Sequence, residues 1–434
     1  MDDVVFDERA PSPGTAEPLV VVSSDGHVAP PLEVYRDYCP QDRQRDFDDY
    51  LDYVSANRQA KSSLSIPTSA QGLKDLDERW INTRAPGGYE VHARLRDMDK
   101  DGVAGEVIFH GSPGGGPMPF TPLGASDLIE DPELVGVGRR MYNRWLADFC
   151  SVEPERHIGL AQLPMWDIES AVRELELAAD LGLKGVNFPG PRPEITPYED
   201  LAWDPFWSAC VDLGMVLANH GGGGVTAAPA IGPAAQFIYT IESVAMSRVS
   251  PIGRFVFSGI FERHPGLKFV QTEQPGWWYP MVLEELDSQY LAFEHRLSEW
   301  LPKRPSEYCR TNYFIGASFQ SRAEAEGAIR DGAVNNVMWG SDYPHPEGTF
   351  HYTEDDDAEP TTRLSMRFTF AGLPGEATKA MLGENAVRVY GCDAAALTEV
   401  ARRIQAPTLD ELAEPVDEPP SHWSLAFRQH GAYH

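Results

Sequence analysis

The stretch Leu19-Val20-Val21-Val22-Ser23-Ser24-Asp25-Gly26-His27 decides how the whole chain is interpreted. Its first four residues are apolar without alternation, which is typical of a strand that is buried on both faces. Its end places a carboxylate and an imidazole just where that strand runs out. We therefore expect an α/β fold with a parallel sheet, whose polar groups gather at the carboxyl ends of the strands.

Seven further short apolar runs follow along the chain. They are Gly105–His110, Ile158–Leu163, Gly185–Phe188, Met215–His220, Leu267–Thr272, Tyr313–Ala317 and Asn336–Asp342. Segments with helical periodicity separate them, such as 168–181 and 277–293, each with an apolar face. Eight strand–helix units without a Gly-x-Gly-x-x-Gly loop predict a (β/α)8 TIM barrel rather than a doubly wound open sheet.

The chain has 434 residues, more than the roughly 250 of an ordinary barrel. We interpret residues 1–434 as one decorated domain with a barrel core at about 19–391, closed by a helix over 376–390. The surplus falls in an acidic N-terminal arm and in three other segments: an insertion at about 30–89, a second at about 349–363 and a C-terminal arm at about 404–434. We expect the two insertions to lie near the mouth of the barrel.

Composition excludes several classes of function. Thirty-six Lys and Arg against 66 Asp and Glu leave a formal charge of −30, which disfavours nucleic acids and anionic membranes as partners. The sequence has no apolar run long enough to span a membrane and no signal peptide, so we expect a cytoplasmic protein. The five cysteines are scattered and form no Cys-x-x-Cys pair, so neither a disulfide framework nor a thiolate zinc site is expected.

The predicted strand ends carry the candidate functional residues. They are Asp25, His27, His110, Asn187, His220, Glu273 and Asp342. Imidazole and carboxylate groups are the usual ligands of Zn²⁺, Fe²⁺ or Mn²⁺ in catalytic sites. Because Asp25 and His27 share one strand end and the other two ligands come from strands five and eight, we expect Asp25, His27, His220 and Asp342 to surround one divalent cation, zinc first, with manganese or iron as alternatives.

Five motifs in order resemble the amidohydrolase-related branch of the amidohydrolase superfamily, which includes the aminocarboxymuconate semialdehyde decarboxylase-like enzymes. These motifs are Asp25-Gly26-His27, Asn219-His220, the segment 259–270, the segment 339–345 and the segment 382–386. The resemblance covers residues 19–391. It implies a mononuclear metal enzyme with the four ligands named above and a homo-oligomeric assembly.

Two departures from that family pattern bear on the reaction. Related decarboxylases place a histidine after strand six, where this chain has Glu273, and the first motif is Asp-x-His where many members have His-x-His. Members with two metals carry a carboxylated lysine at the end of strand four, whereas Lys184 lies at the beginning of that strand and Asn187 nearer its end. We therefore expect a single metal ion.

Asp342 is predicted to act as a metal ligand and as the general acid/base, since one carboxylate oxygen can bind the metal while the other bonds its water. A helix N-cap is its plainer interpretation. Glu273 and His345 are further catalytic candidates, and His345 has the alternative of a surface histidine. His110, Asn187 and Trp277 are candidates for binding substrate, although His110 could cap a turn and Trp277 could be core.

Two of the candidate ligands, Asp25 and His220, also have interpretations that involve no metal. Asp25 before a glycine could be a turn former. His220 with the four glycines after it resembles an esterase oxyanion loop, but the chain has no Gly-x-Ser-x-Gly nucleophile and no His-Glu-x-x-His motif. These interpretations explain single residues and not the set.

Two reactions of a small-molecule substrate fit the predicted site. In hydrolysis, a metal-activated water attacks a cyclic or unsaturated substrate while Asp342 accepts a proton. In non-oxidative decarboxylation, Asp342 protonates a ring or alkene carbon and water is not a reactant. Glu273 favours hydrolysis, because an added carboxylate disfavours an anionic substrate. A non-catalytic metal-binding barrel is the third alternative, and it would predict missing ligands.

Overall fold

The strands of this chain form a parallel ring. The computed structural model describes residues 17–61, 81–121, 131–221, 249–274, 276–355, 357–416 and 424–427. The strands are β1 (Val22–Ser23), β2 (His27–Val28), β3 (Gly105–His110), β4 (His157–Ala161), β5 (Gly185–Asn187), β6 (Val216–Asn219), β7 (Phe269–Thr272), β8 (Tyr313–Ser318) and β9 (Val337–Gly340). They pair in the order β1-β3-β4-β5-β6-β7-β8-β9, with β2 beside β3.

Hydrogen bonds between the first and last strands bring the ring close to closure. The amide of Ser24 donates to the carbonyl of Trp339 at 2.9 Å, and the amide of Asp342 donates to the carbonyl of Asp25 at 3.0 Å. Each pairing in the sheet is parallel. The predicted (β/α)8 barrel is therefore confirmed.

The first predicted strand is not continuous. β1 ends at Ser23 and β2 begins at His27, and in the turn between them the hydroxyl of Ser23 donates to the carbonyl of Asp25 at 2.5 Å. β2 then pairs with the end of β3, with His27 opposite Phe109. The break matters for the site, since it allows residues 25 and 27 to approach the barrel mouth from one segment.

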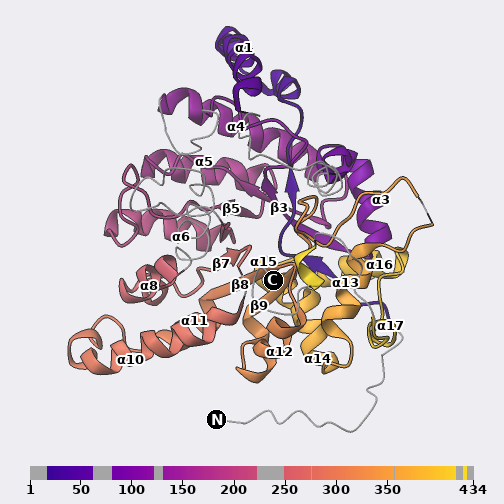
Figure 1. Ribbon diagram of the computed structural model, residues 1–434. Helices are drawn as coiled ribbons and strands as arrows, with labels where there is room; N and C mark the ends of the chain where they lie inside the picture. The colour runs from indigo at the N-terminus through magenta and orange to yellow at the C-terminus, as the bar shows by residue number, and fades with distance from the viewer. Residues whose placement is uncertain are drawn as a thin grey trace.

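Helices surround this ring (Figure 1). They are α3 (Val91–Asp101), α4 (Pro132–Cys150), α5 (Ile168–Asp180), α6 (Asp204–Asp212), α8 (Val249–Phe257), α9 (Ile260–Arg263), α10 (Tyr279–Leu297), α11 (Pro305–Asn312), α12 (Arg322–Arg330), α13 (Thr361–Phe370) and α14 (Gly375–Lys379), followed by α15 (Asn385–Tyr390), α16 (Ala394–Arg403) and α17 (Leu409–Leu412). The predicted closing helix over 376–390 is observed as α14, a π-helical turn at Ala380–Glu384, and α15. No helix in the described ranges is both long and apolar enough to cross a membrane.

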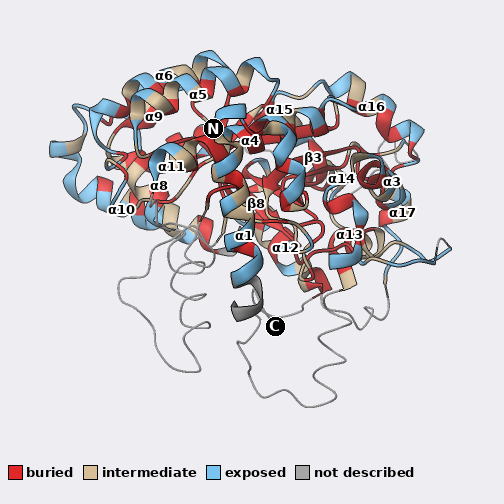
Figure 2. Ribbon diagram, turned by 90° about the horizontal axis from the view of Figure 1, so that it is seen from above, coloured by how far each residue is buried: buried red, intermediate tan, exposed pale blue. Residues whose placement is uncertain are grey.

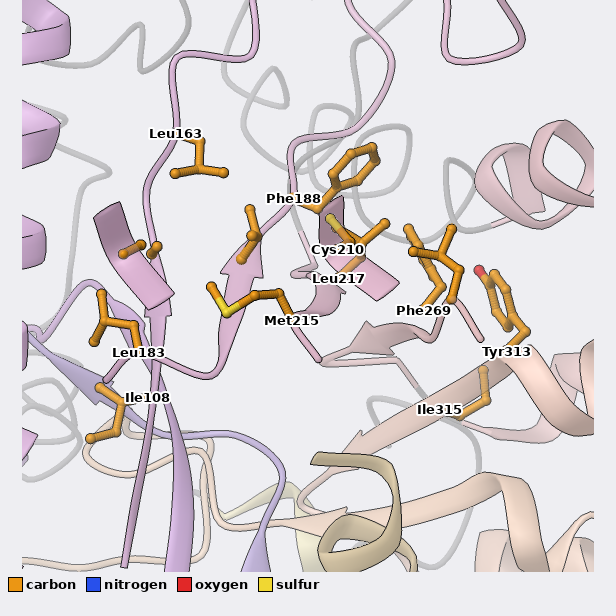
Figure 3. Packing of buried hydrophobic residues seen from close by; sticks show 14 of the residues in the cluster. Ile108, Leu163, Leu183, Phe188, Cys210, Met215, Leu217, Phe269, Tyr313 and Ile315 are labelled. Carbon is orange, nitrogen blue, oxygen red and sulfur yellow. The ribbon is translucent and has the colours of Figure 1, made fainter. Parts of the chain in front are cut away.

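Alternation along the strands divides the apolar side chains between two cores. In β3, Val107 and Phe109 belong to one cluster and Ile108 to the other. The larger cluster lies between strands and helices, and Figure 3 shows Leu217 and Phe269 within it. Figure 2 shows the same organisation, with buried residues on the strands and exposed residues on the outer helices. A period of two with both faces buried is what a helix-covered barrel requires.

The two predicted insertions meet each other. The first contains the 3-10 helix Leu32–Tyr38, α1 (Gln44–Lys61) and three more described 3-10 turns, while residues 62–80 lie outside the described residues. The side-chain amide of Asn82 donates to the carbonyl of Phe350 at 2.9 Å, and its oxygen accepts from the amide of Tyr352 at 2.8 Å. The division of the chain into a core and insertions stays a prediction.

The described part of the C-terminal arm packs on its own barrel. The amide of Leu19 donates to the carbonyl of Pro407, and Leu412 is buried. Further on, the amide of Leu425 donates to the carbonyl of Glu347 at 2.8 Å. The arm therefore reaches the loop that follows β9, which also carries candidate site residues.

Candidate active site

The four predicted ligands come from three separate parts of the barrel and meet at its mouth. Asp25 lies in the turn between β1 and β2, and His27 begins β2. His220 directly follows β6, and Asp342 follows β9 by two residues. All four therefore lie at the carboxyl ends of strands, where barrel enzymes carry their reactive groups.

The ligand atoms of these four side chains are close together. Nε2 of His27 lies 3.2 Å from Oδ1 of Asp25 and 3.2 Å from Oδ1 of Asp342. Nε2 of His220 lies 3.1 Å from Nε2 of His27 and 3.5 Å from Oδ1 of Asp25. The structure thus brings together all four residues that the sequence predicts as ligands.

Hydrogen bonds on the far side of each ring orient the two imidazoles. Nδ1 of His27 faces the carbonyl oxygen of His110 at 3.3 Å, and Nδ1 of His220 faces the carbonyl oxygen of Gly221 at 2.9 Å. Because a carbonyl oxygen only accepts, each Nδ1 carries a proton, which leaves Nε2 as the ring nitrogen that can bind a cation. Such support is usual for metal-ligating histidines.

Both carboxylates keep one oxygen without a hydrogen-bond partner. Asp25 and Asp342 are fully buried. Oδ2 of Asp25 accepts from the hydroxyl of Ser318 at 2.5 Å, whereas its Oδ1 has no hydrogen bond, and neither does Oδ2 of Asp342. A buried carboxylate oxygen without a donor is costly, so the orphaned Oδ1 of Asp25, 3.2 Å from Nε2 of His27 and 3.5 Å from Nε2 of His220, indicates a place where a cation can bind.

The spacing fits a divalent metal ion. Ligands about 2.1 Å from a tetrahedral ion are about 3.4 Å from one another. Ligand atoms of Asp25, His27 and His220 lie 3.1 to 3.5 Å from one another, and Asp342 adds a second carboxylate 3.2 Å from His27. Two imidazoles and two carboxylates suit Zn²⁺, Fe²⁺ or Mn²⁺, so the donor set fits the predicted cofactor.

Glu273 lies against one of these ligands. It follows β7 in a left-handed conformation with φ of 55°, and its Oε2 is 3.3 Å from Nδ1 of His220. A Cβ on Gly221 would lie 2.4 Å from that same oxygen, so a larger residue there would displace the carboxylate of Glu273. Glu273, which is predicted to be catalytic, therefore contacts the Nδ1 side of His220, and the Nε2 side of that ring faces His27.

His345 pairs with Asp342. Its Nδ1 is 2.8 Å from Oδ1 of Asp342, and its Nε2 is 3.0 Å from the carbonyl oxygen of Gly111. Asp342, like Glu273, has a left-handed backbone, with φ of 54°. Non-glycine residues adopt this conformation at a cost, and such residues concentrate at functional sites.

Charge pairing controls the pKa values of the metal-free site. Burial raises the pKa of Glu273 to about 7, with the carboxylates of Asp342 and Asp25 adding to the effect. Burial opposes charge on His220 and His345, but nearby carboxylates, Glu273 and Asp25 for the first and Asp342 for the second, raise both pKa values to about 10. Without a metal, His220 and His345 therefore hold a second ring proton at neutral pH.

The three residues predicted to bind substrate have different placements. The ring of His110 packs edge-on against Tyr142, with centroids 5.0 Å apart, while its backbone carbonyl faces His27. Asn187 ends β5 at the same rim of the barrel. The side chain of Trp277 lies outside the described residues. Their contacts with substrate stay predictions.

Sequence reasoning missed two residues of the site. Ser318 ends β8 and supports Asp25, but the predicted strand stopped one residue earlier. Glu347 has a carboxylate oxygen that lies within 4.8 Å of ligand atoms of Glu273 and Asp342. Listing the residue after every strand would have found Ser318, whereas Glu347 lies inside a loop without a periodic signal.

Comparison with known proteins finds a matching family model and similarity to several enzymes of known reaction. The family model described as amidohydrolase matches residues 109–392. A gamma-resorcylate decarboxylase of a Polaromonas species is 25% identical over 312 residues, which cover 65% of this chain and 87% of the relative. The 2-amino-3-carboxymuconate-6-semialdehyde decarboxylase of Dictyostelium discoideum is 25% identical over 307 residues, covering 66% of this chain and 75% of that enzyme.

Solved structures share the fold. An amidohydrolase from Mycobacterium avium subsp. paratuberculosis superposes with a TM-score of 0.61 at 17% identity, over 86% of this chain and 99% of that one. The 5-carboxyvanillate decarboxylase of Novosphingobium aromaticivorans, solved with manganese and 4-hydroxy-3-methoxy-5-nitrobenzoic acid, has a TM-score of 0.59 at 19% identity, over 87% and 97%. Since the family model covers well over half of the sequence, this chain belongs to the amidohydrolase family.

Proposed function

We propose that this chain is a metal-dependent, non-oxidative decarboxylase of an aromatic or unsaturated carboxylate. The observation that carries the proposal is the 3.1 Å contact between Nε2 of His27 and Nε2 of His220, beside the orphaned Oδ1 of Asp25. The relatives support the choice of reaction, because those named above with a stated reaction are decarboxylases. They favour decarboxylation, whereas the sequence alone favoured hydrolysis.

Asp25, His27, His220 and Asp342 would hold the divalent cation, which supplies a Lewis acid for the substrate carboxylate and an adjacent hydroxyl or carbonyl group. Manganese is the first choice in this proposal, because it is the ion in the Novosphingobium structure and in a Polaromonas dihydroxybenzoic acid decarboxylase. Zinc and iron are the alternatives. The cation would also offset the carboxylates that face an anionic substrate.

Asp342 and His345 would handle the proton. The carboxyl group of Asp342 donates a proton to the carbon that bears the substrate carboxylate. When the bond to the carboxylate breaks, its electron pair returns to the ring or alkene and CO₂ leaves. His345, 2.8 Å from Asp342 and 22% exposed, returns a proton from solvent to that carboxylate. The sum is one carboxylate and one proton giving CO₂ and the protonated product.

Glu273 would act through His220. Its Oε2 faces Nδ1 of that ring at 3.3 Å, which is how carboxylates orient metal-ligating histidines. In this role Glu273 fixes the direction of the Nε2 lone pair. An added carboxylate after strand six is therefore compatible with an anionic substrate.

Hydrolysis is the second candidate, and one observation favours it. Glu273 is 18% exposed, and burial raises its pKa to about 7, which suits a general base acting on water. In that reaction a hydroxide adds to a carbonyl carbon and no CO₂ forms.

One substrate screen separates the two reactions. Protein loaded with Mn²⁺ is incubated with hydroxybenzoates whose carboxylate lies beside a hydroxyl, and with lactones and cyclic amides. Release of CO₂ with a deuteron from D₂O in the product is the expected result, and Asp342→Asn should abolish it. Release of acid from lactones without CO₂ would replace the proposal by hydrolysis.

A further inference from the structure

A buried ion pair lies directly behind two of the candidate metal-ligating segments. Arg94 of α3 is fully buried, and Glu106 of β3 is 2% exposed. We propose that Arg94 is a positioning residue that holds the segments 25–27 and 342–343 together, so that their side chains meet at the metal. The inference rests on the metal site of the proposed function and adds a residue that neither the motifs nor the ligand geometry identifies.

Arg94 contacts the first segment through its backbone. Its Nη1 donates to the carbonyl of His27 at 3.2 Å. This bond holds the peptide group that follows His27. The ring of His27 is held separately, by its 3.3 Å contact with the carbonyl of His110. The backbone and the ring of His27 are thus held from different sides.

Arg94 contacts the second segment through an aromatic ring. Its guanidinium carbon lies 3.7 Å from the ring centroid of Tyr343, within the range of a cation–π interaction. The carbonyl of Tyr343 accepts from the amide of His27 at 2.6 Å, and the amide of Asp342 donates to the carbonyl of Asp25. One guanidinium therefore lies against both partners of the junction that brings the ligands together.

Glu106 keeps the guanidinium in this position. Its oxygens accept from Nε of Arg94 at 3.1 and 3.0 Å, and one of them also accepts from Nη2. The packing continues to the ligand turn, since a Cβ on Gly26 would lie 2.7 Å from Nη2 of Arg94. The glycine between the two ligands is explained by this close approach.

Only an arginine can make these contacts at once. A lysine carries a point charge without the planar fork, so it cannot pair with Glu106, donate to His27 and cover the ring of Tyr343 together. Arg94→Lys should therefore retain the charge and lose the positioning. Supporting residues of this kind typically change metal affinity by about 10- to 100-fold.

The test measures Mn²⁺ affinity of the purified metal-free protein by calorimetry, and the unfolding temperature of the same samples. Arg94→Lys is compared with Arg156→Lys. Arg156 is equally buried and bonds Asp99 and the carbonyls of Ala104 and Val103, with none of these bonds to a ligand segment. We expect Arg94→Lys to weaken Mn²⁺ binding by about 10- to 100-fold and Arg156→Lys to leave it unchanged.

A second variant keeps the test decisive if Arg94→Lys folds poorly. Arg94→Met with Glu106→Leu replaces the ion pair by apolar side chains, an exchange that buried pairs often tolerate. Its affinity should fall by a similar factor while its unfolding temperature in the metal-free state stays near that of the wild type. Unchanged Mn²⁺ affinity in this folded double variant, or an equal loss in Arg156→Lys, would overturn the proposal.

The readout also separates this inference from the proposed reaction. If the wild type binds Mn²⁺ but releases no CO₂ from any compound, the decarboxylase proposal fails while the effect of Arg94 on affinity can still be measured. If the wild type binds no divalent cation, the metal site and the role of Arg94 fail together.

Discussion

Two buried charged clusters of this barrel are built in opposite ways. The ligand cluster consists of Asp25, His27, His220 and Asp342, linked through His27, and the ion-pair cluster consists of Arg94 and Glu106. In the ion-pair cluster, three donor atoms of the guanidinium point at acceptors. In the ligand cluster, two imidazole nitrogens face each other at 3.1 Å and two carboxylate oxygens lack donors.

The difference teaches where to look for function. Both clusters hold fully buried charged side chains, Asp25 and Asp342 in one and Arg94 in the other, so burial alone does not mark a site. Buried polar groups that all have hydrogen-bond partners stabilise a fold. Buried acceptor groups that lie close together without donors indicate a binding site for a cation. The left-handed backbones of Glu273 and Asp342 occur beside the second kind of cluster.

The largest expected effect tests whether the ligand cluster performs chemistry. Asp342→Asn keeps the shape of the side chain but removes the proton donor, so turnover should fall by about 10²- to 10⁴-fold. The loss is measured as kcat for CO₂ release, with metal content determined on the same sample. A turnover number equal to that of the wild type would remove the proposed role of this residue.

Asp101→Asn is the matched control for that variant. Asp101 is also buried, and its carboxylate accepts from the hydroxyl of Thr362 at 2.7 Å. Burial raises its pKa to about 7, so the neutral amide resembles its protonated form. Activity near that of the wild type is expected in the control.

The next effect concerns the ion-pair cluster and pH. Burial acts against the charge of Glu106, but Arg94 and His157 lower its pKa from 4.5 to about 2. A lowered folded-state pKa contributes stability above pH 4.5 that is lost as the pH falls toward 2, and the shift corresponds to about 3 kcal/mol. Glu106→Gln should therefore unfold at lower urea concentration than the wild type at pH 7.

That difference between Glu106→Gln and the wild type should shrink as the pH falls below about 4.5, since the wild-type carboxylate then becomes protonated in the unfolded chain. Urea midpoints of metal-free protein at pH 7, 5 and 4 measure it. A difference that stays constant across this range would mean that the charge of Glu106 does not contribute.

Metal removal should affect only the ligand cluster and not the ion pair of Arg94 and Glu106. Saturation at roughly 100 times the dissociation constant stabilises a protein by about 2.7 kcal/mol, so chelation should lower the unfolding temperature of the wild type. Asp25→Asn removes one ligand charge and should lose most of that metal-dependent difference. Thermal unfolding with and without Mn²⁺ measures both, and an equal metal-dependent shift in this variant would exclude Asp25 as a ligand.

Much of this architecture is predictable from the sequence because it depends on local patterns. Doubly buried strands and amphipathic helices are recognisable as apolar periodicities, which is why the eight-stranded ring was predicted and confirmed. Motif order also predicted the family. The strand-end rule selected Asp25, His27, His220 and Asp342 before any distance was known, and the structure brings those four side chains together.

The rest depends on contacts between distant segments. The turn between β1 and β2 contains a serine hydroxyl that bonds a carbonyl two residues away, which no periodicity reveals. Arg94 and Glu106 lie inside a helix and a strand that look like ordinary core, and their role appears only when α3 is packed against the ligand turn. The preference for hydrolysis rested on the residue type of Glu273, whereas the side chain faces His220.

The smallest expected effect concerns Ser318, which contacts the ligand cluster without belonging to it. Ser318 is the donor that satisfies one oxygen of Asp25, at 2.5 Å, and leaves the other for the metal. Ser318→Ala should let this carboxylate rotate and weaken Mn²⁺ binding by about 10-fold, in line with other residues that support metal ligands. Calorimetric titration of the metal-free variant measures the change.

Ser365→Ala provides the control for this last variant, because Ser365 is equally buried and its hydroxyl donates to the carbonyl of Thr362 away from the ligand cluster. Both variants remove one buried hydroxyl, so both should lose similar stability. If only Ser318→Ala binds Mn²⁺ more weakly, the orientation of Asp25 and not general loosening of the barrel explains the difference. Equal Mn²⁺ affinities in the two variants would mean that Ser318 contributes to stability only and does not orient Asp25.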